Sequence, residues 1–362
     1  MSSDSRLDPT TLDGGISLNF ECPVPAQGTD HVVMGHGSGG KLTARLIEQT
    51  ILPALKNPIL DVLDDQAMLP LDGGRIAFTT DSYVVTPIFF PGGDIGELAV
   101  NGTVNDLAMG GAVPKFLSLA LILEEGTPLF DLERVVASVR RAADRAGVVV
   151  VTGDTKVVPR GSGDGIFVNT AGIGLVPAGV RLSAQRVSPG DAVILSGQIG
   201  DHGVAILASR EGLELEGEFS SDTAALHDLV ASMLAAHSDI HAMRDPTRGG
   251  LAASLVEIAT RQKLGIEVDE RAIPVDDAVR GACEILGLDP LHVANEGKLV
   301  AFVPEVGAEA VLAAMRAHPL GRGAVRIGRV VDTHAGTVVL KTPVGGQRVL
   351  DLPFGESLPR IC

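Results

Sequence analysis

The sequence predicts two α/β (or α+β) domains, and three observations support this. The 362 residues, 45% of them hydrophobic, exceed what one ordinary core organises, so each of two domains can bury its own core. Strand-like and helix-like patterns alternate along the chain. A Ser-Pro-Gly break at 188–190 separates two such regions. We therefore expect a disordered arm over 1–30, an N-terminal domain over 31–185, a C-terminal domain over 186–345 and a flexible tail over 346–362.

The N-terminal arm mixes Ser, Asp, Pro and Gly without a period, so it contributes nothing to the predicted fold. The run IAFTTD from Ile76 predicts a buried strand that ends at Asp81. The run VVVVTGD from Val148 predicts another, which ends at Asp154. Two strands are thus expected to carry carboxylates at their C-terminal tips.

Helices are predicted between and after these strands. Asp94 can cap a helix that runs through Met109 and stops at Gly110-Gly111. The other expected elements are a helix over Leu132–Ala146, a strand at AVILSG from Ala192, and helices over Leu251–Gln262 and Ala308–Ala317. Beyond about Gly345, glycine and proline interrupt every period, so we expect a tail and no core element there.

Composition narrows the class of protein. With 45 acidic and 29 basic residues, the formal charge of −16 offers no patch for gripping nucleic acid. The same charge repels a nucleoside triphosphate, so an ATP site would need local bases or carboxylates that hold a divalent cation. The three cysteines are too few and scattered for a disulfide framework, which favours a reducing cytoplasm. No signal peptide or membrane span is expected.

One set of acidic residues could hold magnesium. Such ions prefer a few carboxylates together with substrate phosphates, and ligands of open α/β sheets bind beyond the strand tips. The alternative for each residue is a turn or cap. The set comprises Asp64, Asp65, Asp81, Asn105, Asp106 and Asp154.

Two segments could contact phosphates. His36-Gly37-Ser38-Gly39-Gly40-Lys41 precedes a helix-like stretch, where glycine N–H groups and Lys41 could cradle an anion. It lacks the spacing of a P-loop, and a flexible linker is the alternative. Gly153-Asp154-Thr155-Lys156 is followed by Arg160, so two bases lie near the expected metal carboxylate. A solvated turn is the alternative there.

Three further features lie towards the C-terminus. Asp245-Pro246-Thr247-Arg248-Gly249-Gly250 opens a helix, which Asp245 or Thr247 could cap. Glu296, in Asn295-Glu296-Gly297-Lys298, is either a general base or an exposed loop residue. Cys362 ends a tail of about seventeen residues that could reach roughly 50 Å, so it could visit two sites, or it could be accidental.

Together these residues resemble the HypE family of hydrogenase-maturation proteins. This family belongs to the superfamily of aminoimidazole ribonucleotide synthetase, selenophosphate synthetase and thiamine-monophosphate kinase. The resemblance covers about residues 31–362. It is carried by FTTDSYVVTPIFFPGGDIGELAVNGTVNDLAMGGAVP from Phe78, VTGDTKVVPRGSGDG from Val151, DPTRGGLA from Asp245, NEGK from Asn295, and the ending PRIC.

The resemblance implies a two-domain aminoimidazole ribonucleotide synthetase-like fold whose N-terminal domains pair in a homodimer, with ATP and Mg²⁺ bound near that interface. It also implies that the carbamoyltransferase HypF carbamoylates Cys362. ATP-dependent dehydration would then make a thiocyanate, and the cyanide would pass to the HypC–HypD complex for the iron centre of NiFe hydrogenase.

The resemblance also assigns roles to individual residues. Asp65, Asp81, Asp106 and Asp154 would hold magnesium. Cys362, Glu296 and Lys156 would be catalytic, with Glu296 as the base. The nucleotide would contact Gly37, Gly39, Gly40, Lys41, Asp65, Asp81, Asn105, Asp106, Gly153, Asp154 and Thr155.

Two other functions remain open at this stage. A small-molecule kinase or synthetase of the same superfamily would use the ATP site on a diffusible substrate. The selenophosphate version wants a reactive cysteine near the glycine-rich segment, and Cys22 lies well before His36. A non-catalytic scaffold would bind ATP only as a conformational ligand.

Overall fold

The computed structural model describes residues 40–46, 48–49, 60–65, 67–71, 74–211 and 219–352. The expected arm, most of the glycine-rich segment and Cys362 lie outside these residues. The α-helices are α1 (Lys41–Leu46), α3 (Ile95–Met109), α4 (Leu129–Ala146), α5 (Asp201–Glu211), α6 (His227–Ala236), α7 (Gly250–Gln262), α8 (Asp277–Leu286) and α9 (Glu305–Ala317).

The strands form two large sheets and a short hairpin. The first sheet has the order β1-β2-β7-β5-β6, the second the order β14-β13-β10-β12-β8-β11-β9, and β3 pairs with β4. The strands are β1 (Ala67–Leu71), β2 (Gly74–Tyr83), β3 (Phe89–Phe90), β4 (Gly93–Asp94), β5 (Val113–Glu124), β6 (Val149–Val158), β7 (Ile166–Val176), β8 (Ala192–Leu195), β9 (Ala242–Arg244), β10 (Gly265–Asp269), β11 (Val300–Val303), β12 (Val325–Val331), β13 (Val338–Lys341) and β14 (Gln347–Leu350).

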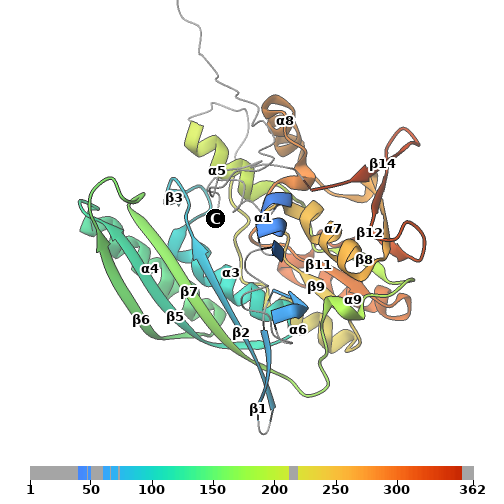
Figure 1. Cartoon of the computed structure of the whole chain (residues 1–362), viewed down its shortest axis with the longest axis horizontal. Coiled ribbons are helices and arrows are strands. Elements are labelled where there is room, and N and C mark those ends of the chain that lie inside the picture. Colours follow the sequence, from blue (N-terminus) through green and yellow to red (C-terminus); the bar gives the residue numbers. More distant parts are fainter. Residues whose placement is uncertain are drawn as a thin grey trace, which may run out of the picture. The chain divides into compact units, whose positions relative to one another are not determined.

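Helix α3 forms as its end signals predict. The Asp94 side chain accepts hydrogen bonds from the N–H groups of Gly96 and Glu97, at 2.8 and 3.0 Å, so the first turn is capped. The helix ends at Met109 with Gly110 at its C-cap. Almost all of α3 is buried, because it packs on β2, β7 and β5 on one side and beside α4 on the other. Figure 1 shows α3 and α4 lying along the first sheet.

The opposite, outer face of the first sheet has no covering element in the described part of the chain. It carries exposed apolar side chains on three neighbouring strands. We call this set the outer apolar face: Phe78, Val113, Phe116, Ile122, Ile173 and Leu175. Strand register places these residues on one side, because Phe78 and Phe116 are both opposite Ile173, and Val113 is opposite Leu175.

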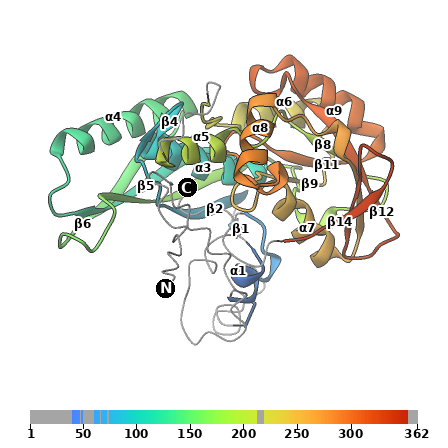
Figure 2. The ribbon, with the colours of Figure 1, turned by 90° about the horizontal axis from the view of Figure 1, so that it is seen from above.

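The second sheet has helices on both faces. Apolar residues of α6 and α9 pack with alternate residues of β8 and β11 on one face, and those of α7 pack on the other. Figure 2 shows α6 and α9 near β8 and β11, with α7 on the other side. One core cluster also joins the two regions, because Leu107 and Met109 of α3 lie in it with Ile194 and Leu229. The expectation of two separate cores is therefore only partly correct.

Three expectations need correction. Asp81 lies inside β2, two residues before its end, and Asp154 lies in the middle of β6. Strand β6 is an exposed edge strand, whereas a buried strand was expected. A run of valines does not distinguish the two, because it is also compatible with an edge strand whose face a second molecule covers. Residues 347–350 form β14 and Leu350 is 3% exposed, so the absence of a core element beyond Gly345 is wrong for these four residues.

No helix in the described ranges has the length and apolar character needed to cross a membrane.

Candidate active site

Partly buried carboxylates gather where β2, α3 and the end of β9 meet. Asp81 and Asp106 contact each other, and Asp245 follows β9 directly. The Thr79 hydroxyl lies 2.6 Å from Asp106 Oδ2 and 3.1 Å from the Asp65 carbonyl oxygen. Burial raises the pKa of Asp106 well above its usual value, and the charges of Asp81 and Asp245 raise it further. Burial and Asp81 raise the pKa of Asp245 to about 6.

This cluster fits a cation that arrives with a nucleotide. Like charges held this close in a buried place are relieved either by protonation or by a bound cation. No three Asp, Glu, His or Cys side chains in the described part are arranged to enclose a metal ion by themselves. Magnesium usually takes one or two carboxylates and completes its shell with water and substrate phosphates. Asp81, Asp106 and Asp245 are therefore suited to such a partial site.

Asp65 lies beside the cluster, but its carboxylate forms an ion pair with Arg244. The side chains of Asp65 and Arg244 are 17% and 10% exposed. Arg244 also donates to the Leu63 carbonyl oxygen at 3.2 Å, and Arg261 donates to the same oxygen at 2.8 Å. The metal role expected for Asp65 stays a prediction, and in this protein it would compete with that ion pair.

Asp154 and Lys156 do not lie with these carboxylates. Across the sheet, Asp81 is opposite Thr170, Thr170 is opposite Leu119, and Leu119 is opposite Gly153. Three strand spacings amount to roughly 14 Å. Asp154 also points to the other face, because its register partner Ala120 alternates with the inward Leu119. Within one chain, the expected four-carboxylate metal set is thus divided between two faces.

The rest of the Gly153–Lys156 motif is exposed. Lys156 Nζ lies 3.4 Å from Asp154 Oδ2, and both side chains are well exposed. Gly153 has a structural reason to be glycine, because a Cβ there would lie 2.1 Å from the Leu119 carbonyl oxygen. Close strand packing accounts for this glycine without a phosphate.

The start of α1 contains the described part of the glycine-rich segment. Gly40 is buried, and the Lys41 ammonium lies 2.5 Å from Asp351 Oδ2, just after β14. Helix α1 has six residues, ending at Leu46. Gly37 and Gly39 lie outside the described residues, so their phosphate role stays a prediction.

Glu296 lies in the buried interior beside the carboxylate cluster and is 3% exposed. The alternative of an exposed loop residue is therefore wrong. Asn295 joins the two motifs, because its N–H and its Nδ2 both donate to the Pro246 carbonyl oxygen, at 3.1 and 3.0 Å. Burial raises the pKa of Glu296 well above its usual value, and Asp245, Asp222 and Asp81 add to the rise. A carboxyl with a raised pKa holds its proton more strongly, so Glu296 is suited to proton transfer.

Asn105 has a different role from the predicted nucleotide contact. Its Nδ2 donates to the carbonyl oxygens of Ala224 and Glu296, at 3.0 and 3.3 Å, and its Oδ1 accepts from Leu226 N–H at 2.8 Å. Asn105 is 1% exposed, and both N–H bonds of its amide are used inside the protein. It fixes the peptide of Glu296, so a nucleotide contact of its side chain would have to compete with these bonds, and that role stays a prediction.

Sequence reasoning missed two residues of this site. Asp245 was considered only as a helix cap, whereas α7 begins with Gly249 at its N-cap position and no side-chain bond. Tyr83 was not considered at all, although it is the only tyrosine of the chain. Its hydroxyl lies 3.4 Å from Asp81 Oδ2, and a Cβ at Gly102 would lie 2.2 Å from that hydroxyl. The glycine on α3 therefore makes room for Tyr83.

Comparison with known proteins identifies the family. The model of the AIR synthase related protein N-terminal domain matches residues 63–176, and that of the C-terminal domain matches residues 188–341. The carbamoyl dehydratase HypE of Azotobacter vinelandii is 56% identical over 331 residues, which cover 91% of this chain and 97% of that protein. The chain belongs to the HypE family of carbamoyl dehydratases.

Solved structures of the HypE family show the same two-domain fold. HypE in a complex with HypF has a TM-score of 0.81 and 46% identity, covering 85% of this chain and 99% of that one. HypE in complex with ATP has a TM-score of 0.78 and 50% identity, covering 92% and 100%. The thiamine monophosphate kinase of Aquifex aeolicus, 20% identical with a TM-score of 0.63, shares the fold alone.

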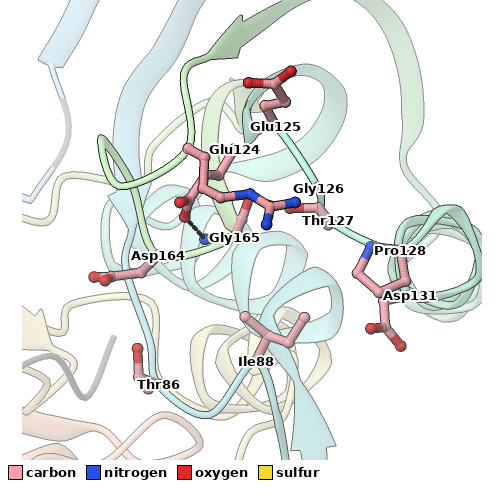
Figure 3. Close-up of a pocket in the computed structure, with 11 residues that line it drawn as sticks. Thr86, Ile88, Glu124, Glu125, Gly126, Thr127, Pro128, Asp131, Asp164 and Gly165 are labelled. Carbon is pink, nitrogen blue, oxygen red and sulfur yellow. Dashed lines mark hydrogen bonds between the residues drawn. The ribbon is translucent and has the colours of Figure 1, made fainter.

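A separate pocket of about 620 Å³ lies between the turn after β2, the start of α4 and the β6–β7 turn, and the motifs that begin at Phe78 and Val151 contribute Thr86, Ile88, Arg160, Asp164 and Gly165 to its wall. Four of its eleven lining residues are acidic, Glu124, Glu125, Asp131 and Asp164 (Figure 3), and Arg160 is the one base among them. Glu124 is already satisfied, because it accepts from the N–H groups of Gly161 and Gly165, which lower its pKa. The pocket contains none of the predicted catalytic residues.

Cys283 is the one cysteine that the structure describes. It is buried in α8, and burial raises its thiol pKa to about 11. A thiol of this kind is a poor nucleophile at neutral pH.

Proposed function

We propose that the protein uses ATP to dehydrate a carbamoylated Cys362 to a thiocyanate, which supplies cyanide for the iron centre of NiFe hydrogenase. One observation carries this proposal. The buried Glu296 carboxyl lies next to the Asp81, Asp106 and Asp245 carboxylates, which combines a proton acceptor with a cation and phosphate site. The HypE relatives named carbamoyl dehydratase, and the HypE structure with ATP, support this assignment.

The proposed reaction needs a leaving group and a base. A thiocarboxamide oxygen leaves poorly, so it first takes the γ-phosphoryl group of ATP, and ADP departs. Glu296 then removes an N–H proton as the C–O bond breaks. The electron pair of that bond leaves with phosphate, loss of the second N–H proton completes the C≡N bond, and the products are thiocyanate, ADP and phosphate. The raised pKa of Glu296 makes its carboxylate a stronger base than that of an exposed glutamate.

Magnesium would neutralise the phosphate charge during this transfer. Among the described residues of one chain, we propose Asp81, Asp106 and Asp245 to hold it. Lys41 is a candidate for a phosphate contact, which would require it to leave Asp351. Asp65 would bind magnesium only if its ion pair with Arg244 were broken.

We infer a homodimer in which the outer apolar face of each chain covers that of the other. Monomeric proteins rarely expose a contiguous apolar surface of this kind, and the same face pairs with itself in a two-fold dimer. Asp154 and Lys156 point to this face and lie far from Asp81 in the same chain. Their proposed metal and catalytic roles therefore require delivery to the site of a second copy.

The proposed partners follow from the family. A HypE relative was solved with HypF, so HypF is the proposed carbamoyl donor enzyme. The HypC–HypD complex is the proposed receiver of the cyanide, and the cytoplasm is the proposed location.

Intact mass tests the proposed function. The protein is incubated with HypF, carbamoyl phosphate and MgATP, and the experiment is repeated with Cys362→Ala and with Cys283→Ala. We expect a gain of about 43 Da that falls to about 25 Da as water is lost, from acyl transfer to sulfur followed by dehydration. Cys283→Ala should behave like the wild type, because its buried thiol takes no part, and Cys362→Ala should stay unmodified.

A further variant in the same experiment tests the role of Glu296 as the base. Glu296→Gln should reach the gain of about 43 Da and stop there, because carbamoylation does not need this carboxyl. An unmodified wild type that consumes ATP with a diffusible substrate would favour the small-molecule kinase. ATP binding without any ADP formation would favour the scaffold.

A further inference from the structure

The main chain of Glu296 is held at both of its polar groups by side chains distant in sequence. Its N–H donates to Asp222 Oδ1 at 3.0 Å. Its carbonyl oxygen accepts from Asn105 Nδ2 at 3.3 Å. Neither bond uses the carboxyl of Glu296. The two contacts therefore fix the main-chain position from which this side chain extends, without engaging the carboxyl itself.

The Asp222 carboxylate makes the more extensive of these contacts. Its Oδ2 accepts from the Gly297 N–H at 3.3 Å and from Lys298 Nζ at 2.9 Å. The Asp222 side chain is 5% exposed, so these are shielded, charge-assisted hydrogen bonds. One carboxylate thus binds three consecutive residues, from Glu296 to Lys298.

The main chain of Asp222 lies directly against the main chain of Gly297 in the same turn. A Cβ at Gly297 would lie 1.8 Å from the Asp222 carbonyl oxygen. No side chain is compatible with that approach, so the glycine of the NEGK motif is explained by its contact with Asp222. Both the side chain and the backbone of Asp222 therefore define the path of the chain at Glu296.

The segment that carries Asp222 is itself anchored to two helices near the site. The Asn101 and Asn105 side chains of α3 donate to Thr223 Oγ1 at 3.2 Å and to the Ala224 carbonyl oxygen at 3.0 Å. His202 Nδ1 of α5 lies 2.8 Å from Ser221 Oγ. Because α3 also carries Asp106, the segment of Asp222 links Glu296 to the helix that carries one carboxylate of the cluster.

We propose that Asp222 is a positioning residue for Glu296, which sets the carboxyl at the distance from the phosphate site that proton removal requires. This inference rests on the proposed function. Displacing a catalytic group by about 1 Å can cost about a hundredfold in rate. Nucleotide affinity should be little affected, because Asp222 contacts the turn of Glu296 and not the cluster of Asp81, Asp106 and Asp245.

Asp222→Asn is the test. Asparagine keeps one acceptor oxygen but presents N–H donors towards the Gly297 N–H and the Lys298 ammonium, so the turn must shift. We expect kcat for conversion of the carbamoylated protein to fall about ten- to a hundredfold, with KM for ATP within about twofold of the wild type. Single-turnover mass spectrometry on separately carbamoylated protein measures both quantities.

Asp191→Asn is the matched control. The Asp191 carboxylate is equally buried, accepts from the Ser188 N–H at 2.9 Å and pairs with His241 Nδ1 at 2.8 Å. Asp191 precedes β8, whereas Ser196 follows the other end of this strand and accepts a hydrogen bond from the N–H of Leu299, next to Lys298. Asp191→Asn should alter thermal stability and leave kcat within about twofold of the wild type, because it does not touch the turn of Glu296.

The outcomes separate the possibilities. A folded Asp222→Asn with wild-type kcat, or equal losses of kcat in both variants, would overturn the inference. If Asp222→Asn does not fold, Lys298→Met loosens the same contact, and we expect kcat to be about threefold lower than that of the wild type at unchanged KM. Wild-type kcat in that variant would equally overturn it. A wild type that never forms thiocyanate removes the proposed function and the inference together, whereas an active wild type with an active Asp222→Asn removes the inference alone.

Discussion

Arg244 and Asp65 form a buried ion pair that ties the segment before β1 to the end of β9. Arg244 also donates to the Leu63 carbonyl oxygen, and Glu257 lies 3.7 Å from its guanidinium. Removing one partner of such a pair leaves an uncompensated charge in the interior, which is more costly than the pair is worth.

Arg244→Met should therefore lower the free energy of unfolding by about 3 kcal/mol, measured by urea denaturation. Arg326→Met is the control. Arg326 makes two 2.7 Å contacts with Glu305, but this pair is exposed and should contribute less than about 1 kcal/mol. Equal losses in the two variants would contradict a buried role for Arg244.

Asp245 should make the ligand-free protein less stable as the pH rises. Its folded pKa of about 6 lies above the value of about 3.9 expected in the unfolded chain, so folding favours the protonated carboxyl. The stability it contributes is complete below about pH 4 and is lost as the pH rises through about 6. Asp245→Asn removes this titration. As the pH rises through this range, the free energy of unfolding of the variant should therefore increase by on the order of 2 kcal/mol relative to that of the wild type.

Thermal unfolding of both proteins without nucleotide, from pH 4 upwards, checks the Asp245 prediction. Glu267→Gln provides a control of opposite sign. Hydrogen bonds from Lys341 and Arg329 lower the pKa of Glu267, so its contribution is present above its unfolded pKa and is lost as the pH falls. A stability difference between Asp245→Asn and the wild type that does not change with pH would refute the prediction.

Tyr83 can be observed directly, because the chain has one tyrosine and no tryptophan. Burial, followed by the charge of Asp81, raises the pKa of Tyr83 well above its usual value. The ordinary pKa of tyrosine is about 10, and the denatured protein should titrate at this value. In the folded protein, we expect tyrosinate absorbance to appear only at higher pH. In Asp81→Asn the transition should move down from that of the wild type. A folded protein that titrates at the ordinary pH would refute this placement of Tyr83.

Gly102 should tolerate no side chain, because a Cβ would lie 2.2 Å from the Tyr83 hydroxyl. Alanine is favoured over glycine in a helix by about 1 kcal/mol, but the clash should exceed this gain and destabilise the protein by about 1–3 kcal/mol. Gly281→Ala on α8 meets nothing within 4 Å and should instead stabilise by up to about 1 kcal/mol. Unfolding curves and tyrosine fluorescence compare the two variants, and a stabilised Gly102→Ala would contradict the observed contact.

Local signals were sufficient for much of the fold. The Asp94 cap, the end of α3 at Met109 and the strand around Ile76 depend on residues close in sequence, and all three were predicted. The valines of β6 have the same local pattern whether a strand is central or at an edge. That distinction depends on which strands pair, which is set by contacts distant in the sequence.

The site was harder to predict from the sequence for the same reason. Glu296 and Asp245 are adjacent only because Asn295 binds the carbonyl oxygen of Pro246, 49 residues away. The pairing of Asp65 with Arg244 and the face to which Asp154 points also depend on such long-range packing. The motifs identified most of the residues, whereas their grouping into one buried cluster and one exposed face required the structure.

The outer apolar face yields the last prediction. Phe116 of this face is 48% exposed, and a second copy would bury it. Phe116→Glu should therefore convert a dimer to monomers in analytical ultracentrifugation, because a charge would have to be buried at the interface. Ile285→Glu is the control, since Ile285 is 73% exposed but lies on α8, outside this face.

Thiocyanate formation should fall together with dimerisation in Phe116→Glu, because Asp154 and Lys156 share that face and could no longer reach a second copy. Raising the protein concentration should restore part of both, by mass action. A wild-type protein that is monomeric at micromolar concentration, or monomers with full activity, would show that Asp154 and Lys156 do not act across such an interface.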